Sequence, residues 1–510
     1  MTEDRQENKW AVWLAVAALV VIAGGLRGWK LDGECYYSDE CASVQHLSAG
    51  SLSEFLSRVR TSDPPMTPAF FVLEYGWSRM VGQGAARLRL LPLFLGLLAI
   101  PLLYLLGALV YGRRGGLAAA MFFTFSLTQI YYSQEMRPYA LVLVLALLSL
   151  IALWHGLRKE QARRWWALHW LCNILLPWCH LFTVFFVLSQ GCYLLAWSAQ
   201  RRRWTVPFWW GLSQVPNAVL LFLWVHSINY AELSTAASWR LEIVHSYLQP
   251  LSDFLEFAGA GVPLFRDMPL AGGRNMAAIM WRFFGLLVLL YLVLNAWRGA
   301  RRLRRGADPE AGRVWESFLF VVTLLAVPSV TLFLVSALVY SCHSSRYVLY
   351  GSIPFALLLG GCVALLPGKW ARGLVVASIL AVQCINLAVH PKPWRPDTVA
   401  AAGYLETRTG KDAHLTVHHA SDIPSLLLAS PKGFPARVID GVVHLDEIVP
   451  AFQESARQAE KDNWLLVSTH QLALEKLAAV EDGLRAGGWT LERAQFGEVN
   501  PIYVYRVYRP

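Results

Sequence analysis

The sequence predicts an α-helical polytopic membrane protein with a C-terminal soluble α/β domain. Hydrophobic residues make up 55% of the 510 residues and charged residues only 16%, whereas soluble globular chains contain roughly 25% charged residues. The apolar residues are concentrated in runs of about 17–25 residues, the length of a helix that crosses a bilayer. The 22 tryptophans agree with this prediction, because tryptophan is enriched at both membrane interfaces.

Eleven runs have the length and composition of membrane-spanning helices. The first run is not followed by a small-residue cleavage site, so we expect it to be retained and not removed as a signal peptide. The predicted spans are Trp10–Gly25, Leu88–Tyr111, Gly116–Tyr132, Pro138–Leu157, Trp165–Cys179, Leu181–Trp197, Phe208–His226, Met280–Trp297, Phe318–Tyr340, Tyr347–Leu366 and Leu374–His390.

Basic residues in the connections predict the topology. One set of alternate connections holds 17 Lys and Arg and the other set holds 5, and these residues are concentrated on the cytoplasmic side. The same bias accounts for the formal net charge of +10, so we do not expect nucleic acid as a partner. Counting Met66–Gly82 as a twelfth span would place the arginine-rich connections outside. We therefore expect this segment, which carries Glu74 and Arg79, to be an amphipathic helix on the outer surface.

This topology divides the chain into two domains. Residues 1–390 form the transmembrane domain, with a first outer loop over 28–87 that contains the juxtamembrane helix 66–82, and a further outer loop over 227–279. The N-terminus is then cytoplasmic, and residues 391–510 lie outside. In this second domain, strand-like segments such as HLTVHH and NWLLVSTH alternate with helical segments, a pattern typical of a small α/β domain.

Candidate functional residues gather in the predicted outer loops. Charged groups near a membrane are costly unless they are paired or face water, so they mark candidate sites. Carboxylates can deprotonate a hydroxyl or an amine, and arginine can hold a phosphate through two parallel hydrogen bonds. This chemistry suits the transfer of a group from a lipid phosphate to an acceptor. The candidates are Asp39 and Glu40 after the first span, Glu135 and Arg137 in a tight turn, His180, His343 and Arg346.

Several segments resemble GT-C glycosyltransferases, which include protein O-mannosyltransferases and the aminoarabinose transferases that modify lipid A. The motif SDE, residues 38–40, looks like their Asp-Glu motif, and DPPMTPAFFVLEYGWSRMVG is similar to their His-Pro-Pro-Leu segment. The stretch from RLLPLFLGLL to SQEMRPYAL and the segment SSRYVLYGSIPFALLL resemble later spans and loops of bacterial members. The resemblance covers roughly residues 10–366. Asp63 stands where many members have histidine.

The resemblance implies an outer-face active site, a polyprenyl-phosphate-linked sugar donor and a catalytic base at Asp39. We expect Asp39 and Glu40 to be catalytic. Neither a CxxC pair nor a glycine-rich phosphate loop occurs, so we expect no cofactor and no metal. The residues expected at the donor phosphate are Arg346, Arg137, Glu135, Tyr139 and Tyr347, and those expected at the substrate are His180, Asp63 and His343.

Structural roles are the alternative for each of these residues. Glu135 can cap a helix or pair with Arg137, Arg137 and Arg346 can anchor the chain at the interface, and His180 can be a hydrogen-bonded turn residue. Cys35 and Cys41 either form a disulfide or are free thiols.

The sequence thus predicts an inverting glycosyltransferase in the cytoplasmic membrane, the inner membrane of a bacterial envelope. Its predicted partners are a polyprenyl-phosphate-linked sugar, membrane lipids and an acceptor that is a lipid, a glycan or a protein. Two other classes compete with this prediction. A transporter or flippase of lipid-linked sugars would move the donor without consuming it. A non-catalytic envelope scaffold would neither move the donor nor consume it.

Overall fold

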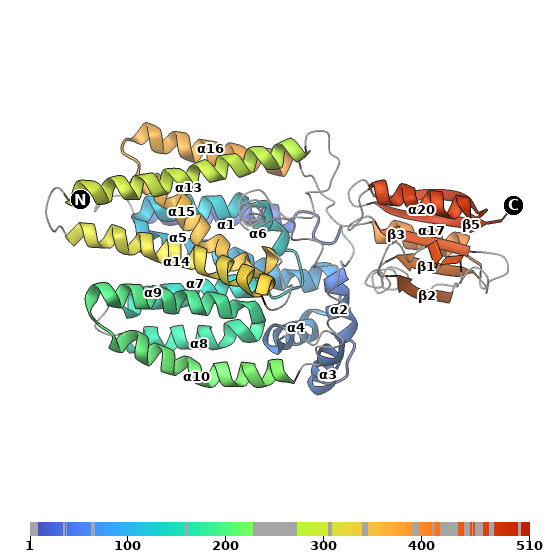
Figure 1. Ribbon diagram of the computed structural model, residues 1–510, viewed down its shortest axis with the longest axis horizontal. Helices are drawn as coiled ribbons and strands as arrows, with labels where there is room; N and C mark the ends of the chain where they lie inside the picture. The colour runs from blue at the N-terminus through green and yellow to red at the C-terminus, as the bar shows by residue number, and fades with distance from the viewer. Residues whose placement is uncertain are drawn as a thin grey trace.

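A computed structural model describes most of the helical part of the chain and the frame of the C-terminal domain. Figure 1 shows a large helical domain and a smaller sheet domain at one end of it. The predicted outer loop 227–279 lies almost wholly outside the described residues. These are 9–33, 36, 38–62, 67–158, 162–227, 273–303, 309–338, 345–389, 397–410, 413–418, 437–442, 449–450, 452–453, 463–468, 474–497 and 501–509.

Long apolar helices build the helical domain, which confirms the predicted fold class. Within the described residues, eight helices are long and apolar enough to cross a membrane; the count of eleven spans stays a prediction. The eight are α1 (Lys9–Gly28), α5 (Ala85–Phe125), α7 (Tyr139–Gly156), α9 (Val184–Arg201) with the short helix η2 (Leu181–Thr183) before it, α10 (Thr205–His226), α14 (Pro309–Leu338), α15 (Ser352–Leu365) with the short helix η5 (Ser345–Gly351) before it, and α16 (Lys369–Val389). Two further helices, α8 (Arg163–Cys179) and α13 (Gly273–Leu303), accompany them.

Helix α5 contains two of the predicted spans, because the chain reverses direction inside it. Gly112 has φ 79° and ψ 175°, a conformation that glycine adopts without steric cost. A Cβ atom on Gly107 would lie 2.7 Å from the Cα atom of Gly116, although nine residues of straight helix would separate these glycines by about 13 Å. The two arms of α5 are therefore a hairpin whose backbones touch, as small residues permit in membrane helices.

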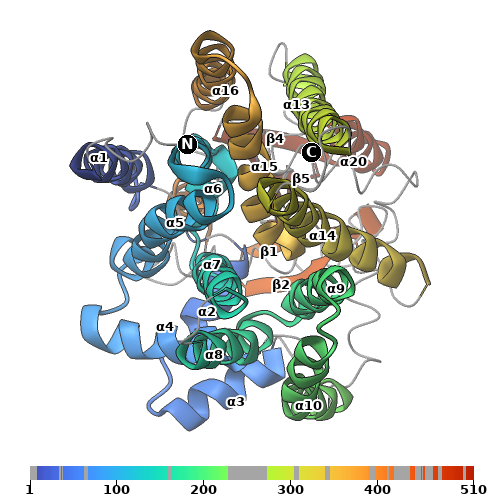
Figure 2. The ribbon, with the colours of Figure 1, turned by 90° about the vertical axis from the view of Figure 1, so that its left-hand side faces the viewer.

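Helices α7 and α15 lie at the centre of the helical domain. In the apolar stretch of each span, 78% of the residues are buried in α7 and 94% in the span that contains α15. The corresponding shares are only 17% for α1 and 11% for α10. In Figure 2, α7 lies among α5, α8 and α9, while α1, α10 and α16 lie at the periphery. The peripheral helices expose leucine, valine and tryptophan side chains, as expected of surfaces that face lipid.

The first outer loop folds into three short helices, of which the sequence predicted only the last. These are α2 (Ser38–His46), α3 (Leu52–Ser62) and α4 (Pro68–Val81). Buried apolar residues of all three, such as Val44, Phe55 and Phe71, pack with Leu88 at the start of α5 and with Met136. This small core fixes the loop against the helical domain.

Arg27, in the last turn of α1, joins the first helix to the end of α5. Its side chain is fully buried, and it donates hydrogen bonds to the backbone oxygens of Phe123 and Thr124 and to Ser133 Oγ at 3.0, 3.1 and 3.2 Å. The guanidinium thus satisfies carbonyl groups that a helix end leaves without a partner. It also fixes the position of the short helix α6 (Leu127–Tyr132) and of the turn that follows.

The C-terminal domain is the small α/β domain that the sequence predicted. Its five strands have the order β2-β1-β3-β5-β4; β1 pairs in parallel with β2 and β3, and β5 pairs antiparallel with β3 and β4. Alternate residues of β3 face opposite sides: Leu465 packs with α20 and Trp464 with α17. The elements are α17 (Thr398–Arg408), β1 (His414–His418), β2 (Arg437–Val442), β3 (Asn463–Ser468), α20 (Leu474–Ala486), β4 (Thr490–Phe496) and β5 (Ile502–Tyr508).

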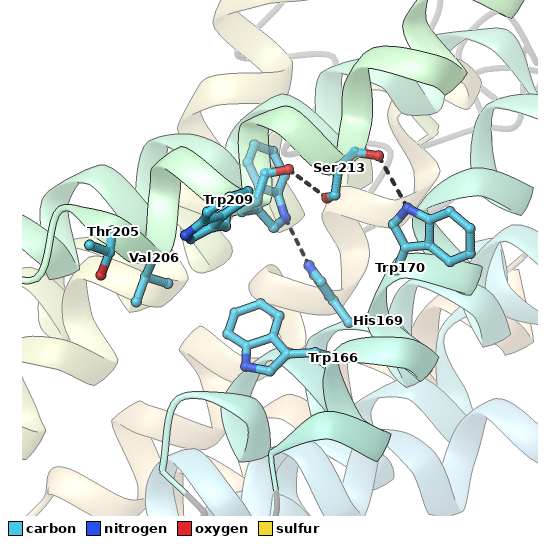
Figure 3. Close-up of a pocket in the computed structure, with 8 residues that line it drawn as sticks. Trp166, His169, Trp170, Thr205, Val206, Trp209 and Ser213 are labelled. Atoms are coloured by element: carbon cyan, nitrogen blue, oxygen red, sulfur yellow. Dashed lines mark hydrogen bonds between the residues drawn. The ribbon is translucent and has the colours of Figure 1, made fainter.

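A cavity of about 390 Å³ lies between the first halves of α8 and α10. Its lining residues are drawn in Figure 3 and include four tryptophans. The predicted site residue His180 follows the opposite end of α8, so the cavity and the candidate site lie at different places along this helix.

Candidate active site

Glu40 is the centre of a buried polar junction between the first outer loop and the helical domain. Its carboxylate accepts hydrogen bonds from Arg89 Nε at 3.1 Å and Arg89 Nη2 at 2.8 Å, and both side chains are buried. The backbone N–H of Met136 donates to Glu40 Oε1 at 3.0 Å, and Arg89 Nη1 donates to the backbone oxygen of Leu31 at 2.9 Å. The junction therefore holds α2, the start of α5 and the loop after α6 together.

Asp39 lies in the first turn of α2, directly before Glu40. Its backbone position is thus fixed by the same junction, while its side chain lies outside the described part of the structure. Asp63 and His343 lie wholly outside it, as does Cys35, so the choice between a Cys35–Cys41 disulfide and free thiols stays open. The roles expected of these residues stay predictions.

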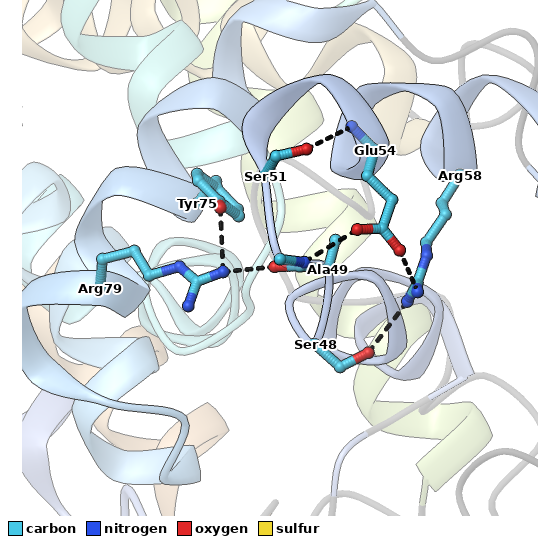
Figure 4. A network of polar contacts seen from close by, with 8 residues as sticks. Ser48, Ala49, Ser51, Glu54, Arg58, Tyr75 and Arg79 are labelled. Atoms are coloured by element: carbon cyan, nitrogen blue, oxygen red, sulfur yellow. Dashed lines mark hydrogen bonds and ion pairs between the residues drawn. The ribbon is translucent and has the colours of Figure 1, made fainter.

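A hydrogen-bonded network joins α3 and α4 to the segment between α2 and α3 (Figure 4). Arg79 on α4 donates to the backbone oxygen of Ala49 and to the Tyr75 hydroxyl. Glu54 on α3 accepts from the backbone N–H of Gly50 at 2.9 Å and pairs with Arg58 at 2.5 Å. Arg79, one of the two charges that argued against a span in Met66–Gly82, thus helps to fix the folded loop.

The tight turn after α6 is buried along its whole length. Glu135 and Arg137 are only 2% and 3% exposed, and the N–H of Arg137 donates to the backbone oxygen of Glu135 at 2.7 Å. The guanidinium carbon of Arg137 lies 6.0 Å from the ring centre of Phe71 on α4. The turn therefore carries a buried cation toward the first outer loop.

His180 and Tyr347 bring two further loops to this turn. The His180 ring lies 5.6 Å from that of Tyr139 and 5.4 Å from that of Tyr347. Tyr347 belongs to η5 (Ser345–Gly351), and the guanidinium carbon of Arg346 lies 5.6 Å from the ring centre of Tyr347. Burial and the charges of Arg137 and Arg346 lower the pKa of His180 to about 3. His180 is therefore neutral and can form hydrogen bonds, but it does not supply a charge.

Glu74 is a candidate site residue that was not predicted as one from the sequence. It lies on the buried face of α4 and is 1% exposed. Within the described structure, neither of its carboxylate oxygens has a hydrogen-bond partner. Burial raises the pKa of Glu74 to about 8; the charge of Glu40 acts in the same direction and that of Arg137 opposes it. Glu74 is therefore an acid that holds its proton at neutral pH beside the two charged groups.

The structure thus brings most of the predicted site residues to one end of the helical domain. Arg89 is the other residue that the sequence reading missed. It could have been recognised in the sequence, because it is an arginine at the beginning of an apolar run, where a charge requires a partner. Among the described residues, no three His, Cys, Asp or Glu side chains are grouped as ligands of a metal ion. The residues brought together are Glu40, Glu135, Arg137, Tyr139, His180, Arg346 and Tyr347.

Comparison with known proteins supports the fold. Neither a protein-family model nor a curated protein sequence matches the chain. The chain is similar to the oligosaccharyltransferase of Archaeoglobus fulgidus in its apo form, with 11% identity and a TM-score of 0.52 over 97% of this chain and 75% of that chain. A structure of the same enzyme tethered to an acceptor peptide gives 10% identity and a TM-score of 0.50 over 97% and 74%.

A third similar structure is ArnT from Cupriavidus metallidurans bound to undecaprenyl phosphate. It has 13% identity and a TM-score of 0.43 over 98% of each chain. The fold of the present chain is that of the GT-C-type membrane glycosyltransferases, as the resemblance of its motifs predicted.

Proposed function

We propose that the protein is a membrane glycosyltransferase that moves a sugar from a polyprenyl-phosphate donor to an acceptor at the outer face of the cytoplasmic membrane. One observation carries the proposal: loops about two hundred residues apart in the chain bring Arg137 and Arg346 to the buried ring of His180, whose pKa both charges lower. The ring of Tyr347, which lies 5.6 Å from the Arg346 guanidinium carbon, is 5.4 Å from that of His180. Two cations beside one buried ring suit a phosphate, which arginine binds through paired hydrogen bonds.

The proposed reaction is a single displacement at the anomeric carbon. Asp39 removes the proton from a hydroxyl or amine of the acceptor, and the acceptor atom forms a bond to the anomeric carbon. The bond from that carbon to the phosphate oxygen breaks at the same time, and the electron pair leaves with the polyprenyl phosphate. The configuration at the anomeric carbon is therefore inverted, by analogy with inverting glycoside hydrolysis.

Arg346 and Arg137 stabilise the charge that develops on the departing phosphate, which is the usual role of fixed cations in such a site. Tyr139, Tyr347 and His180 form an uncharged aromatic wall beside them, and Glu135 lies in the same turn as Arg137. Asp63 and His343 are proposed to contact the substrate.

Glu40 is proposed to act beside Asp39 as a positioning residue. Its carboxylate already accepts three hydrogen bonds from Arg89 and Met136, so it is poorly placed to take a proton from an acceptor. It instead fixes the turn of helix on which Asp39 lies. Asp39 is therefore the better base of the two acidic residues.

The proposed topology follows the distribution of basic residues. Connections such as GRRG and SAQRRRWTVP are placed in the cytoplasm, and the first outer loop and the C-terminal domain are placed outside. The proposed site then faces the outer side of the membrane. The sugar and the class of acceptor stay open.

Transfer of labelled sugar by the purified full-length protein tests the proposal. We expect incorporation from a polyprenyl-phosphate-linked sugar into an acceptor fraction from the envelope, with release of polyprenyl phosphate. Movement of the intact donor across a vesicle membrane, without its consumption, would indicate a transporter instead. Absence of both activities in a folded protein, across donors with several sugars, would favour a scaffold.

A further inference from the structure

The cavity between α8 and α10 is an aromatic pocket on the side of the helical domain (Figure 3). Trp170 is 45% exposed and Trp209 is 64% exposed, so the pocket opens at the surface of the protein. Its volume of about 390 Å³ is within the range of small-molecule sites. The tryptophans that line it are Trp166, Trp170, Trp209 and Trp210.

Hydrogen bonds inside the protein hold two of these tryptophans in place. Trp210 Nε1 donates to His169 Nε2 at 2.9 Å, and Trp170 Nε1 donates to the backbone oxygen of Ser213 at 3.1 Å. A Cβ atom on Gly191 would lie 2.7 Å from the Trp210 ring, so this ring packs directly on the backbone of α9. The polar atoms of both indoles are thus used internally, and their apolar surfaces line the pocket.

His169 is part of a closed polar network behind the pocket. Its Nδ1 lies 3.1 Å from the backbone oxygen of Ser149. Ser149 Oγ in turn lies 2.8 Å from Asn173 Oδ1 and 3.1 Å from Gln190 Oε1. The network joins α7, α8 and α9 to Trp210, so the inner wall of the pocket is rigid.

Three arginines lie within three residues of pocket-lining residues in the chain. Arg163 precedes Trp166 by three residues on α8 and therefore lies on the same side of that helix. Arg202 and Arg203 come directly before the first turn of α10, where Thr205 lines the pocket. All three are exposed, and within the described structure none of them forms an ion pair with a carboxylate. Arg201 beside them differs, because it lies 3.6 Å from Glu316.

We propose that this pocket binds an anionic phospholipid. The acyl chain lies between the tryptophans, and the phosphate and acidic headgroup are held by Arg163, Arg202 and Arg203. Basic residues at the cytoplasmic end of membrane helices bind acidic lipid headgroups in this way. The connections that carry these arginines are the ones whose basic residues predict a cytoplasmic location. The lipid is therefore one of the inner leaflet, on the side of the membrane opposite to the proposed transfer site.

Native mass spectrometry of the delipidated full-length protein tests the proposal. The two probes are phosphatidylglycerol and phosphatidylcholine with identical acyl chains. We expect tighter binding of phosphatidylglycerol to the wild type. In Arg202→Gln/Arg203→Gln this preference should fall by about fivefold per arginine removed, as expected for cations at a lipid surface. Phosphatidylcholine should lose less affinity than phosphatidylglycerol, because its choline group offsets the charge of its phosphate.

Two more variants separate the chain from the headgroup. Trp209→Ala should weaken binding of both lipids, because it removes part of the chain's contact area. The matched control is Lys369→Gln/Trp370→Ala, which removes an exposed cation and an exposed tryptophan at the start of α16 and should change neither affinity. Equal binding of both lipids to the wild type would overturn the proposal. An equal loss in the control variant, or full binding in the Trp209 variant, would do the same.

Discussion

Glu40 and Arg89 form a two-pronged ion pair in which both side chains are buried, with N–O distances of 2.8 and 3.1 Å. The pair joins the first outer loop to the start of α5, and the N–H of Met136 adds the loop that carries Arg137. Three segments far apart in sequence therefore take their relative positions from one carboxylate.

Removing one partner of this pair should destabilise the protein strongly. Arg89→Leu leaves a buried carboxylate without its counterion, and such changes cost about 3–5 kcal/mol. The double variant Glu40→Leu/Arg89→Leu should lose less stability than the two single variants added together. Thermal unfolding of the purified proteins, compared as a double-mutant cycle, measures this. An Arg89→Leu variant with an unchanged unfolding midpoint would contradict the structural role of the pair.

Asp39 and Glu40 should differ in what their substitution damages. Asp39→Asn should lower turnover by about 10²–10⁴-fold, the usual contribution of a general base, and leave the unfolding midpoint unchanged. Glu40→Gln should lower the midpoint as well as turnover. Glu54→Gln is the control, because Glu54 is an exposed carboxylate in the same loop and should affect turnover little. Labelled-sugar transfer and thermal unfolding of the same samples check the prediction; normal turnover in Asp39→Asn would remove Asp39 as the base.

Arg346 should bind the donor through its two-pronged guanidinium. Arg346→Ala should raise the apparent dissociation constant of the lipid-linked donor and lower turnover, and Arg346→Lys should restore only part, because lysine keeps the charge but not the paired geometry. Arg60→Ala is the matched control, since the Arg60 guanidinium carbon likewise lies 5.3 Å from an aromatic ring, that of Trp224. If Arg346→Lys equals the wild type, Arg346 is an interfacial anchor.

Glu74 should make the stability of the protein fall as the pH rises. Its pKa is about 8 in the folded protein and about 4.3 in an unfolded chain. The folded state therefore holds more protons between these values, and stability decreases with pH through this window. Glu74→Gln removes the effect, so its unfolding midpoint should rise relative to the wild type on going from pH 5 to pH 8. A constant difference across that range would mean that Glu74 is ionised in the folded protein.

His180 should have the opposite pH dependence. Its pKa is about 3 in the folded protein and about 6.5 when unfolded, so below pH 6.5 the unfolded state binds more protons and stability falls as the pH falls. His180→Gln should be less sensitive to acid than the wild type in thermal unfolding. The pH dependence of its turnover between pH 6 and 9 should keep the wild-type shape. Loss of a titration step in that range would instead identify His180 as an acid or base.

Apolar runs and strand-like segments were sufficient to predict the fold class. Apolar runs gave the helices, and GRRG marked the reversal at Gly112 because it separates two runs by glycines and charges. The segment NWLLVSTH predicted a strand, which β3 confirms; that both of its faces are covered, with Leu465 packed on α20 and Trp464 on α17, is seen only in the structure. These properties are local, so a single sequence contains them.

Properties that depend on distant partners were not predicted. The segment TLERAQF has no clear apolar alternation, and it forms β4 because it pairs with β5 at the edge of the sheet, where charged residues such as Glu492 and Arg493 are tolerated. Glu74 is an unusual residue only because the fold buries it. In the sequence it was one of two charges that argued against a span.

Arg27 has a consequence for the order in which the protein is assembled during synthesis. The residues that accept hydrogen bonds from its guanidinium come 96 to 106 residues later in the chain. Until they have entered the membrane, the charged head of Arg27 has to stay in the headgroup region, which a long side chain at a helix end can reach. The first helix can pack earlier against the first arm of α5, where the ring of Trp13 lies 5.5 Å from that of Tyr104, and the hydrogen bonds of Arg27 complete its docking once the later residues are in place.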